Sequence, residues 1–200
     1  MRLRLVSAAM IAAATLIATT LIALTGHATA QSFFGGDDRY QILAPRGASG
    51  IAYSPIPKSQ VSFAGAYTPG TIVINTTERR LYYVLGNGEA IRYGIGVGRL
   101  GFTWAGVTAV SAKKEWPDWT PPSQMLARRP DLPRHMKGGI ENPLGARAMY
   151  LGSSLYRIHG SNEPETIGQA VSSGCFRMTN EDVVDLYQRV KVGSKVIVLR

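Results

Sequence analysis

The sequence of 200 residues is poor in the side chains that most often carry catalysis or bind metals. It contains one cysteine, Cys175, and three histidines. A single cysteine excludes a disulfide within the chain, and neither the cysteine nor the histidines show the paired spacing of a zinc site. The candidates for a nucleophile and for its base are therefore few.

Acidic residues are also scarce: 13 Asp and Glu stand against 22 Lys and Arg, which gives a formal net charge of +9. A basic protein can bind anionic polymers or membrane surfaces, although the same charge can serve solubility alone. The basic residues are scattered along the chain instead of clustered. This pattern argues against a nucleic-acid partner.

The first thirty residues have the order of a secretory signal. Arg2 and Arg4 are followed by an uncharged run over 5–24 and then by the small residues Ala28 and Ala30. This order predicts a signal peptide over 1–30, cleaved after Ala30, and hence an exported protein. The uncharged run is long enough to span a bilayer, so an uncleaved membrane anchor is the alternative.

Export makes the lone cysteine informative. Exported proteins normally hold their cysteines in pairs, because the compartment oxidises them. Cys175 therefore indicates either an intermolecular disulfide or a reactive thiol. His27 would leave with the signal peptide, so only His135 and His159 remain in the mature chain as possible bases.

Turn residues divide the rest of the chain into segments. Residues 31–67 are rich in Gly, Ser, Ala and Pro without periodicity, which predicts a flexible linker or arm. Short apolar runs then predict strands over 72–75, 80–85, 90–97, 107–113, 146–151, 156–159 and 195–199. Thr179, with Asp182 three places on, is typical of a helix start, and a second short helix is predicted near 165–170. We therefore predict a mainly β domain over 68–200, of sandwich or barrel-like architecture with one or two short helices.

The segment "VSSGCFRM", which contains Cys175, has the features that a thiol nucleophile needs. Gly174 allows close backbone approach and unusual dihedral angles. If the segment is extended, Cys175 and Arg177 share one face while Phe176 and Met178 point to the core. The same alternation in "YRIHG" predicts that a neighbouring strand brings His159 beside Cys175.

Each of these residues also has an ordinary structural interpretation. A lone cysteine often packs as a small hydrophobic residue, and a lone histidine is more often structural than catalytic. Arg177 alone would be a surface or ion-pair arginine, and the tryptophan–proline run over 116–122 would serve packing. A metal site formed by His135, His159 and Cys175 stays a minor alternative, because a fourth ligand is not apparent.

The segment "HGSNEPETIGQAVSSGCFRM" resembles the active-site signature of L,D-transpeptidases of the YkuD type, in which His-Gly is followed some sixteen residues later by Ser-x-Gly-Cys-x-Arg. The segments "GTIVINTTERRLYYV", "KKEWPDWTPPSQM", "GGIENPLGARAMYL" and "DLYQRVKVGSKVIVL" are also similar to the family. One branch of the family has a histidine before the Gly-Cys pair, where this chain has Ser173.

The resemblance implies an L,D-transpeptidase catalytic domain over 68–200 that works on peptidoglycan stem peptides in the periplasm. It implies that His159 accepts the proton of Cys175 and that the thiolate attacks the carbonyl at stem position three, releasing D-alanine. The acyl group then passes to an amine of another stem peptide or of an envelope protein. A hydrolase with the same dyad and a non-catalytic wall-binding module are the alternatives.

The resemblance also implies roles for the neighbours of the dyad. Backbone N–H groups of Gly174 and Cys175 would hold the oxyanion. The expected substrate-binding or loop-supporting residues are Arg177, Ser172, Ser173 and Gly160. We expect no metal, no organic cofactor and a monomeric protein.

Overall fold

The computed structural model describes residues 54–200. The predicted signal peptide over 1–30 and most of the predicted linker therefore lie outside the described residues. Within the described part of the chain, no helix is long and apolar enough to cross a membrane.

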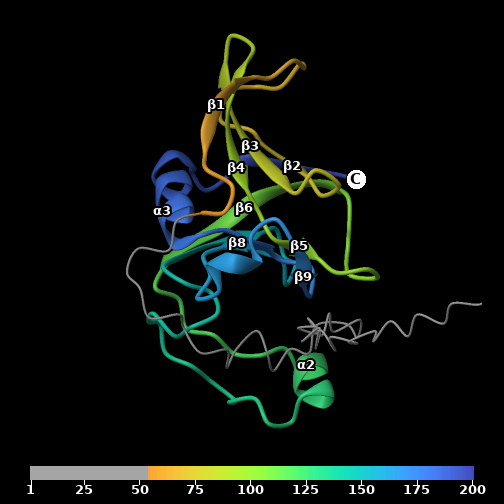
Figure 1. Ribbon diagram of the computed structural model, residues 1–200, viewed down its shortest axis with the longest axis vertical. Helices are drawn as coiled ribbons and strands as arrows, with labels where there is room; N and C mark the ends of the chain where they lie inside the picture. The colour runs from red at the N-terminus through yellow and green to blue at the C-terminus, as the bar shows by residue number, and fades with distance from the viewer. Residues whose placement is uncertain (1–53) are drawn as a thin grey trace, which may run out of the picture. The chain divides into compact units, whose positions relative to one another are not determined.

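The regular secondary structure of the described residues consists mainly of strands, which confirms the predicted fold class (Figure 1). The helical elements are α2 (Ser123–Arg128), the 3₁₀ turn η1 (Pro164–Thr166) and α3 (Asn180–Arg189). The strands are β1 (Ser59–Ser62), β2 (Ile72–Asn75), β3 (Arg80–Gly86), β4 (Glu89–Gly94), β5 (Val97–Gly98), β6 (Gly106–Glu115), β7 (Arg147–Leu151), β8 (Arg157–His159), β9 (Ala170–Ser172), β10 (Phe176–Arg177) and β11 (Lys195–Leu199).

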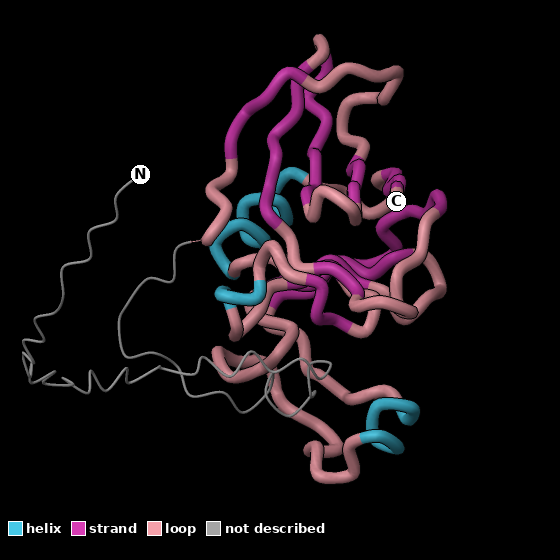
Figure 2. Tube along the Cα trace, turned by 45° about the vertical axis from the view of Figure 1, so that its right-hand side comes forward, coloured by secondary structure: helices cyan, strands magenta, loops and turns pink. Residues whose placement is uncertain are grey.

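The long strand β6 joins two halves of one strand order, β1-β4-β3-β2-β11-β6-β7-β8-β10. Its first half pairs with β11 and its second half with β7, and the register shifts between Val110 and Ala112. A shift of this kind bends a strand and increases its twist, so β6 passes from one half of the order to the other. Figure 2 shows the strands of the two halves running in different directions. β5 and β9 form a separate pair, labelled in Figure 1.

The apolar core lies where these halves and α3 meet. Its members share complete or nearly complete burial and include Tyr93, Met149, Ile158, Phe176 and Leu186. As predicted, Thr179 caps α3: its hydroxyl accepts a hydrogen bond from the N–H of Asp182 at 3.2 Å. The cap satisfies an N–H that the first helical turn leaves unpaired.

The structure differs from the predicted linker over 31–67 at its C-terminal end. Ser59–Ser62 forms β1 and pairs antiparallel with β4. The Lys58 ammonium also contacts the Asp185 carboxylate of α3 at 3.2 Å. β1 is an edge strand, and all of its side chains are at least partly exposed. Its sequence therefore lacks the alternation of apolar and polar residues that predicts a half-buried strand.

Residues 116–145 form an excursion between β6 and β7 that carries α2 and extends below β8 in Figure 1. It has a small apolar cluster of its own, formed by Trp119, Leu132 and Leu144. The buried Asn142 amide donates to the carbonyls of Pro117, Met136 and Lys137. These contacts join separate parts of the excursion, and α2 lies beside the candidate site.

Candidate active site

The parallel pair β8 and β10 brings the two predicted reactive residues together. In its register Phe176 lies opposite Ile158, and Arg177 lies opposite His159. Cys175 immediately precedes β10. Phe176 and Met178 are almost completely buried, whereas Cys175 and Arg177 line a pocket, so the predicted alternation holds.

The turn that carries Cys175 requires glycine at position 174. Gly174 has φ +107°, and a Cβ there would lie 2.5 Å from a ring carbon of Tyr156. The hydroxyl of Ser172 donates to the carbonyl of Cys175 at 2.6 Å and accepts from the N–H of Gly174 at 3.1 Å. Ser172 therefore closes the turn that presents the thiol.

These bonds bear on the predicted oxyanion donors. The Gly174 N–H is already occupied by Ser172. The Cys175 N–H has no hydrogen-bond partner among residues 54–200. Of the two predicted donors, the Cys175 N–H is therefore the one available to an oxyanion within the described residues.

His159 is 4% exposed, and its ring is held by the chain itself. Nδ1 lies 2.6 Å from the carbonyl oxygen of Gly160. Because a carbonyl can only accept, Nδ1 carries the proton, and the lone pair of Nε2 has no partner within residues 54–200. Burial, together with the positive charge of Arg177, lowers the pKa of His159 to about 3. The imidazole is therefore neutral at physiological pH.

Gly160 acts through its backbone. It does not line the pocket, although we predicted it among the substrate-binding or loop-supporting residues. A Cβ on Gly160 would lie 2.3 Å from Oδ1 of Asn180, an atom that accepts the N–H of Ala146 at 2.8 Å. The glycine thus lets β8 pass close to the start of α3.

The Cys175 side chain is partly buried at the edge of the pocket, and its Sγ lies 3.7 Å from the carbonyl oxygen of Leu155. Burial raises the pKa of the Cys175 thiol, although the nearby Arg157 opposes the rise. A cysteine nucleophile reacts as its thiolate, which a nearby positive group would stabilise. The resting pair in the structure is instead a neutral thiol beside a neutral imidazole, so the thiolate must form by proton transfer.

Arg177 has a partner that the sequence did not reveal. Its Nη1 lies 3.1 Å from Oε2 of Glu163, and the two side chains are 12% and 6% exposed. The other carboxylate oxygen of Glu163 is buried with no hydrogen-bond partner among the described residues. Burial raises the pKa of Glu163 to about 7, against the opposing charge of Arg177. Two acidic residues follow His159 closely, Glu163 and Glu165, and no pattern distinguishes the buried one.

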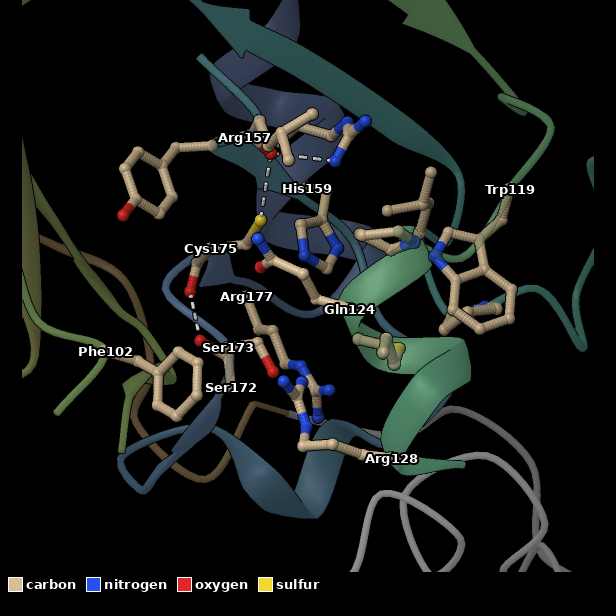
Figure 3. Close-up of a pocket in the computed structure, with 16 residues that line it drawn as sticks. Phe102, Trp119, Gln124, Arg128, Arg157, His159, Ser172, Ser173, Cys175 and Arg177 are labelled. Carbon is tan, nitrogen blue, oxygen red and sulfur yellow. Dashed lines mark hydrogen bonds between the residues drawn. The ribbon is translucent and has the colours of Figure 1, made fainter. Parts of the chain in front are cut away.

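A pocket of about 340 Å³ lies between the excursion and the strands β8–β10. Of the predicted residues, Cys175, His159, Arg177, Ser172 and Ser173 line it (Figure 3). Trp119 and Pro122 also line it, although the sequence predicted a packing role for the tryptophan–proline run over 116–122. The sequence indicated no site role for the other lining residues, which are Phe102, Gln124, Met125, Arg128, Pro143, Leu144, Leu155, Tyr156 and Arg157.

The described residues contain no group of three or more His, Cys, Asp or Glu side chains that could hold a metal ion. His135 lies in the excursion, where its Nε2 is 3.4 Å from a carboxylate oxygen of Asp118. The structure thus places His135 beside Asp118 and outside the pocket that Cys175 lines.

A family model described as the L,D-transpeptidase catalytic domain, YkuD, matches residues 69–198. The chain belongs to this family. The Escherichia coli protein named probable L,D-transpeptidase YbiS is 42% identical over 134 residues, which are 62% of this chain and 43% of that protein. The chain thus spans less than half the length of that relative.

Solved structures show the same fold. An L,D-transpeptidase from Mycobacterium smegmatis, 18% identical, aligns over 65% of this chain and 58% of its own with a TM-score of 0.53. A Brucella melitensis structure, named as a probable carnitine operon oxidoreductase, is 48% identical. It covers 72% of this chain and 94% of its own, with a TM-score of 0.50.

Proposed function

We propose that this chain is an exported peptidoglycan L,D-transpeptidase in which Cys175 is the nucleophile and His159 the base. One observation carries the proposal: the only thiol of the chain lines a pocket together with a buried, neutral imidazole whose Nε2 is free to accept a proton. Family membership supports the reaction class, and the stem peptide, the acceptor and the periplasmic location belong to the proposal.

In the first half-reaction, His159 Nε2 takes the thiol proton while Sγ attacks the carbonyl carbon of the third stem residue. The bond from this carbon to the nitrogen of D-alanine then breaks, and the proton on His159 passes to the leaving amine. D-alanine departs, and a thioester remains on Cys175. The neutral imidazole offers the lone pair of Nε2 to the thiol proton. Because the pKa of His159 is low, the protonated ring gives the proton up readily to the leaving amine.

In the second half-reaction, His159 takes a proton from an acceptor amine as the amine attacks the thioester. The carbon–sulfur bond breaks and the proton returns to sulfur. The product is an amide between the third stem residue and the acceptor, which is another stem peptide or an envelope protein. No metal or organic cofactor enters either step.

The tetrahedral oxyanion of both steps is proposed to accept a hydrogen bond from the Cys175 N–H. This group is fixed in place by the Ser172 bonds to the same turn. A prepositioned backbone donor of this kind is worth about 3 kcal/mol in the transition state. The hydroxyl of Ser173, which is buried without a partner in the described part of the chain, is proposed to bind the substrate.

The test is the release of D-alanine from a stem tetrapeptide by the wild-type protein and by Cys175→Ala. We expect the variant to release none while its circular dichroism and thermal unfolding match those of the wild type. His135→Ala serves as the matched control, because it removes the other described histidine from outside the pocket. Release of D-alanine by the alanine variant would refute the assignment.

A hydrolase that passes the acyl group to water would use the same dyad. Product analysis with and without an added amine acceptor separates the two: a transpeptidase gives an amide-linked dimer, and a hydrolase gives only the tripeptide. A wall-binding module would bind sacculi without thiol reactivity, which labelling of Cys175 with iodoacetamide tests directly.

The Brucella relative is named as a probable oxidoreductase, so we also considered a dinucleotide-binding site in this chain. The glycines Gly96, Gly98 and Gly101 have the spacing of a dinucleotide-binding run. In such a site the run opens a helix, whose N-terminus binds the pyrophosphate. Here the run passes through a turn and continues into β6. The geometry therefore favours acyl transfer.

A further inference from the structure

The walls of the pocket carry charge of one sign. Its lining includes three arginines, Arg128, Arg157 and Arg177, and no aspartate or glutamate. Glu163 pairs with Arg177 without lining the pocket. A partly enclosed cavity with this lining favours an anionic ligand, because low-dielectric walls strengthen the field of the charges.

The three arginines have different partners. Arg177 is paired with the Glu163 carboxylate. Arg157 donates from Nη1 to the carbonyl of Leu155 at 2.9 Å, and its guanidinium lies 5.1 Å from the ring centre of Tyr150. Arg128 makes no hydrogen bond or ion pair with any residue in 54–200, and its guanidinium lies 5.7 Å from the ring centre of Phe102. Among the described residues, Arg128 is therefore the lining arginine whose hydrogen-bond donors have no partner.

The position of Arg128 is nonetheless defined. It occupies the last residue of α2, and Figure 3 shows its side chain reaching from this helix toward Phe102 and Ser172. The ring of Phe102 also lies 4.6 Å from the guanidinium of Arg99. A ring that attracts cations orients the Arg128 guanidinium while its N–H groups stay available. Arg128 thus places at the pocket a guanidinium that can donate two parallel hydrogen bonds and that donates none to residues 54–200.

We propose that Arg128 is a specificity-determining residue that binds a carboxylate of the acyl donor and so selects donors in which this carboxylate is not amidated. The inference rests on the proposed function and adds to it the charge state of the substrate. A guanidinium matches a carboxylate with two parallel hydrogen bonds, and a carboxamide cannot accept both. Stem tetrapeptides carry several carboxylates, and the experiment identifies the one that is bound.

The experiment measures D-alanine release by the wild type, Arg128→Gln and Arg134→Gln. Arg134 is the matched control, because it is an exposed arginine of the same excursion that does not line the pocket. The donors are a tetrapeptide with free carboxylates and its singly amidated forms at the terminal residue, the third-residue side chain and the second residue. Loss of a charge-assisted pair predicts at least a tenfold higher KM for Arg128→Gln, with kcat changed less than threefold.

The amidated donors give the decisive pattern. One of them should be at least tenfold poorer than the free donor for the wild type, and Arg128→Gln should treat the two alike. Arg134→Gln should behave as the wild type does, and Arg128→Lys should recover part of the discrimination. The inference is overturned if Arg128→Gln discriminates all donors as the wild type does, or if Arg134→Gln shows the same loss.

Binding to the Cys175→Ala protein, measured by calorimetry with the same donors, separates this inference from the proposed function. If the wild type releases no D-alanine, the proposed function fails. The dependence of binding on Arg128 and on one free carboxylate still decides the inference. Equal affinity of Cys175→Ala and the double variant Cys175→Ala/Arg128→Gln for the free donor would refute it.

Discussion

Replacing Glu163 by glutamine tests how burial and the charge of Arg177 together set the pKa of this carboxyl. The carboxyl is 6% exposed and lies 3.1 Å from a guanidinium nitrogen of Arg177. Burial raises the pKa of Glu163 from 4.5 to about 7, because desolvation outweighs the attraction of Arg177. Glutamine keeps the shape of the side chain and cannot ionise.

The sign follows from proton linkage. Because the folded state holds the Glu163 proton more tightly than the unfolded state, this group stabilises the fold below pH 4.5, and the contribution is lost as the pH rises through about 7. At about 1.4 kcal/mol for each pKa unit, the loss amounts to about 3 kcal/mol. Glu163→Gln lacks this loss. The wild type should therefore become less stable relative to the variant by about 3 kcal/mol between pH 4.5 and pH 8.

The assay is urea denaturation of both proteins at a series of pH values, followed by tryptophan fluorescence. Glu165→Gln is the matched control, since Glu165 is exposed two residues away, and its stability should follow the wild type at every pH. A free-energy difference that stays flat with pH would refute the argument. A difference that grows in favour of the wild type would mean that the ion pair with Arg177 outweighs burial.

Two further predictions concern the dyad and its turn. His159→Ala should shift iodoacetamide labelling of Cys175 to higher pH, since no neutral imidazole remains to take the thiol proton. The control His135→Ala should leave the pH profile of labelling unchanged. An unchanged profile in His159→Ala would exclude His159 as the base. Gly174→Ala should cost at least about 2 kcal/mol of unfolding free energy and most activity, because strain adds to the 2.5 Å contact with Tyr156. Gly101→Ala, at φ +85° with open space around it, should show the strain alone, and an equal loss would refute the role of the contact.

The sequence predicted local structure well where burial leaves a pattern. The strands at 72–75 and 195–199 occur with the predicted bounds, because each is a short apolar run that follows turn residues. Their pairing with each other could not be predicted. It is parallel and joins segments more than a hundred residues apart, and no local feature encodes such a partner.

The helix α2 was missed for a related reason. It has six residues, follows two prolines, buries none of its side chains and lacks a side-chain N-cap, so neither periodicity nor capping marks it. Packing of the excursion around Trp119 and Asn142 positions it instead. The contribution of Arg128 to the pocket is therefore a property of the tertiary structure.

The sequence predicted those parts of the site that follow from the alternation of side chains along two short strands. His159, Cys175 and Arg177 meet because β8 and β10 are neighbours, as the sequence indicated. Electrostatics depend on burial, which the sequence does not give: the neutral state of His159 and the partner of Arg177 required the structure. That the Gly174 N–H already donates to the Ser172 hydroxyl likewise could not be predicted from the sequence.

Intact-protein mass spectrometry during turnover of a stem tetrapeptide tests the central claim most directly. The account predicts a covalent adduct with the mass of the tripeptide acyl group, formed with release of D-alanine and located on Cys175 by peptide mapping. The adduct should disappear when an amine acceptor is added and should never form on Cys175→Ala. The account would be contradicted if wild-type protein quenched with acid during turnover carried no adduct. An adduct at any residue other than Cys175 would contradict it as well.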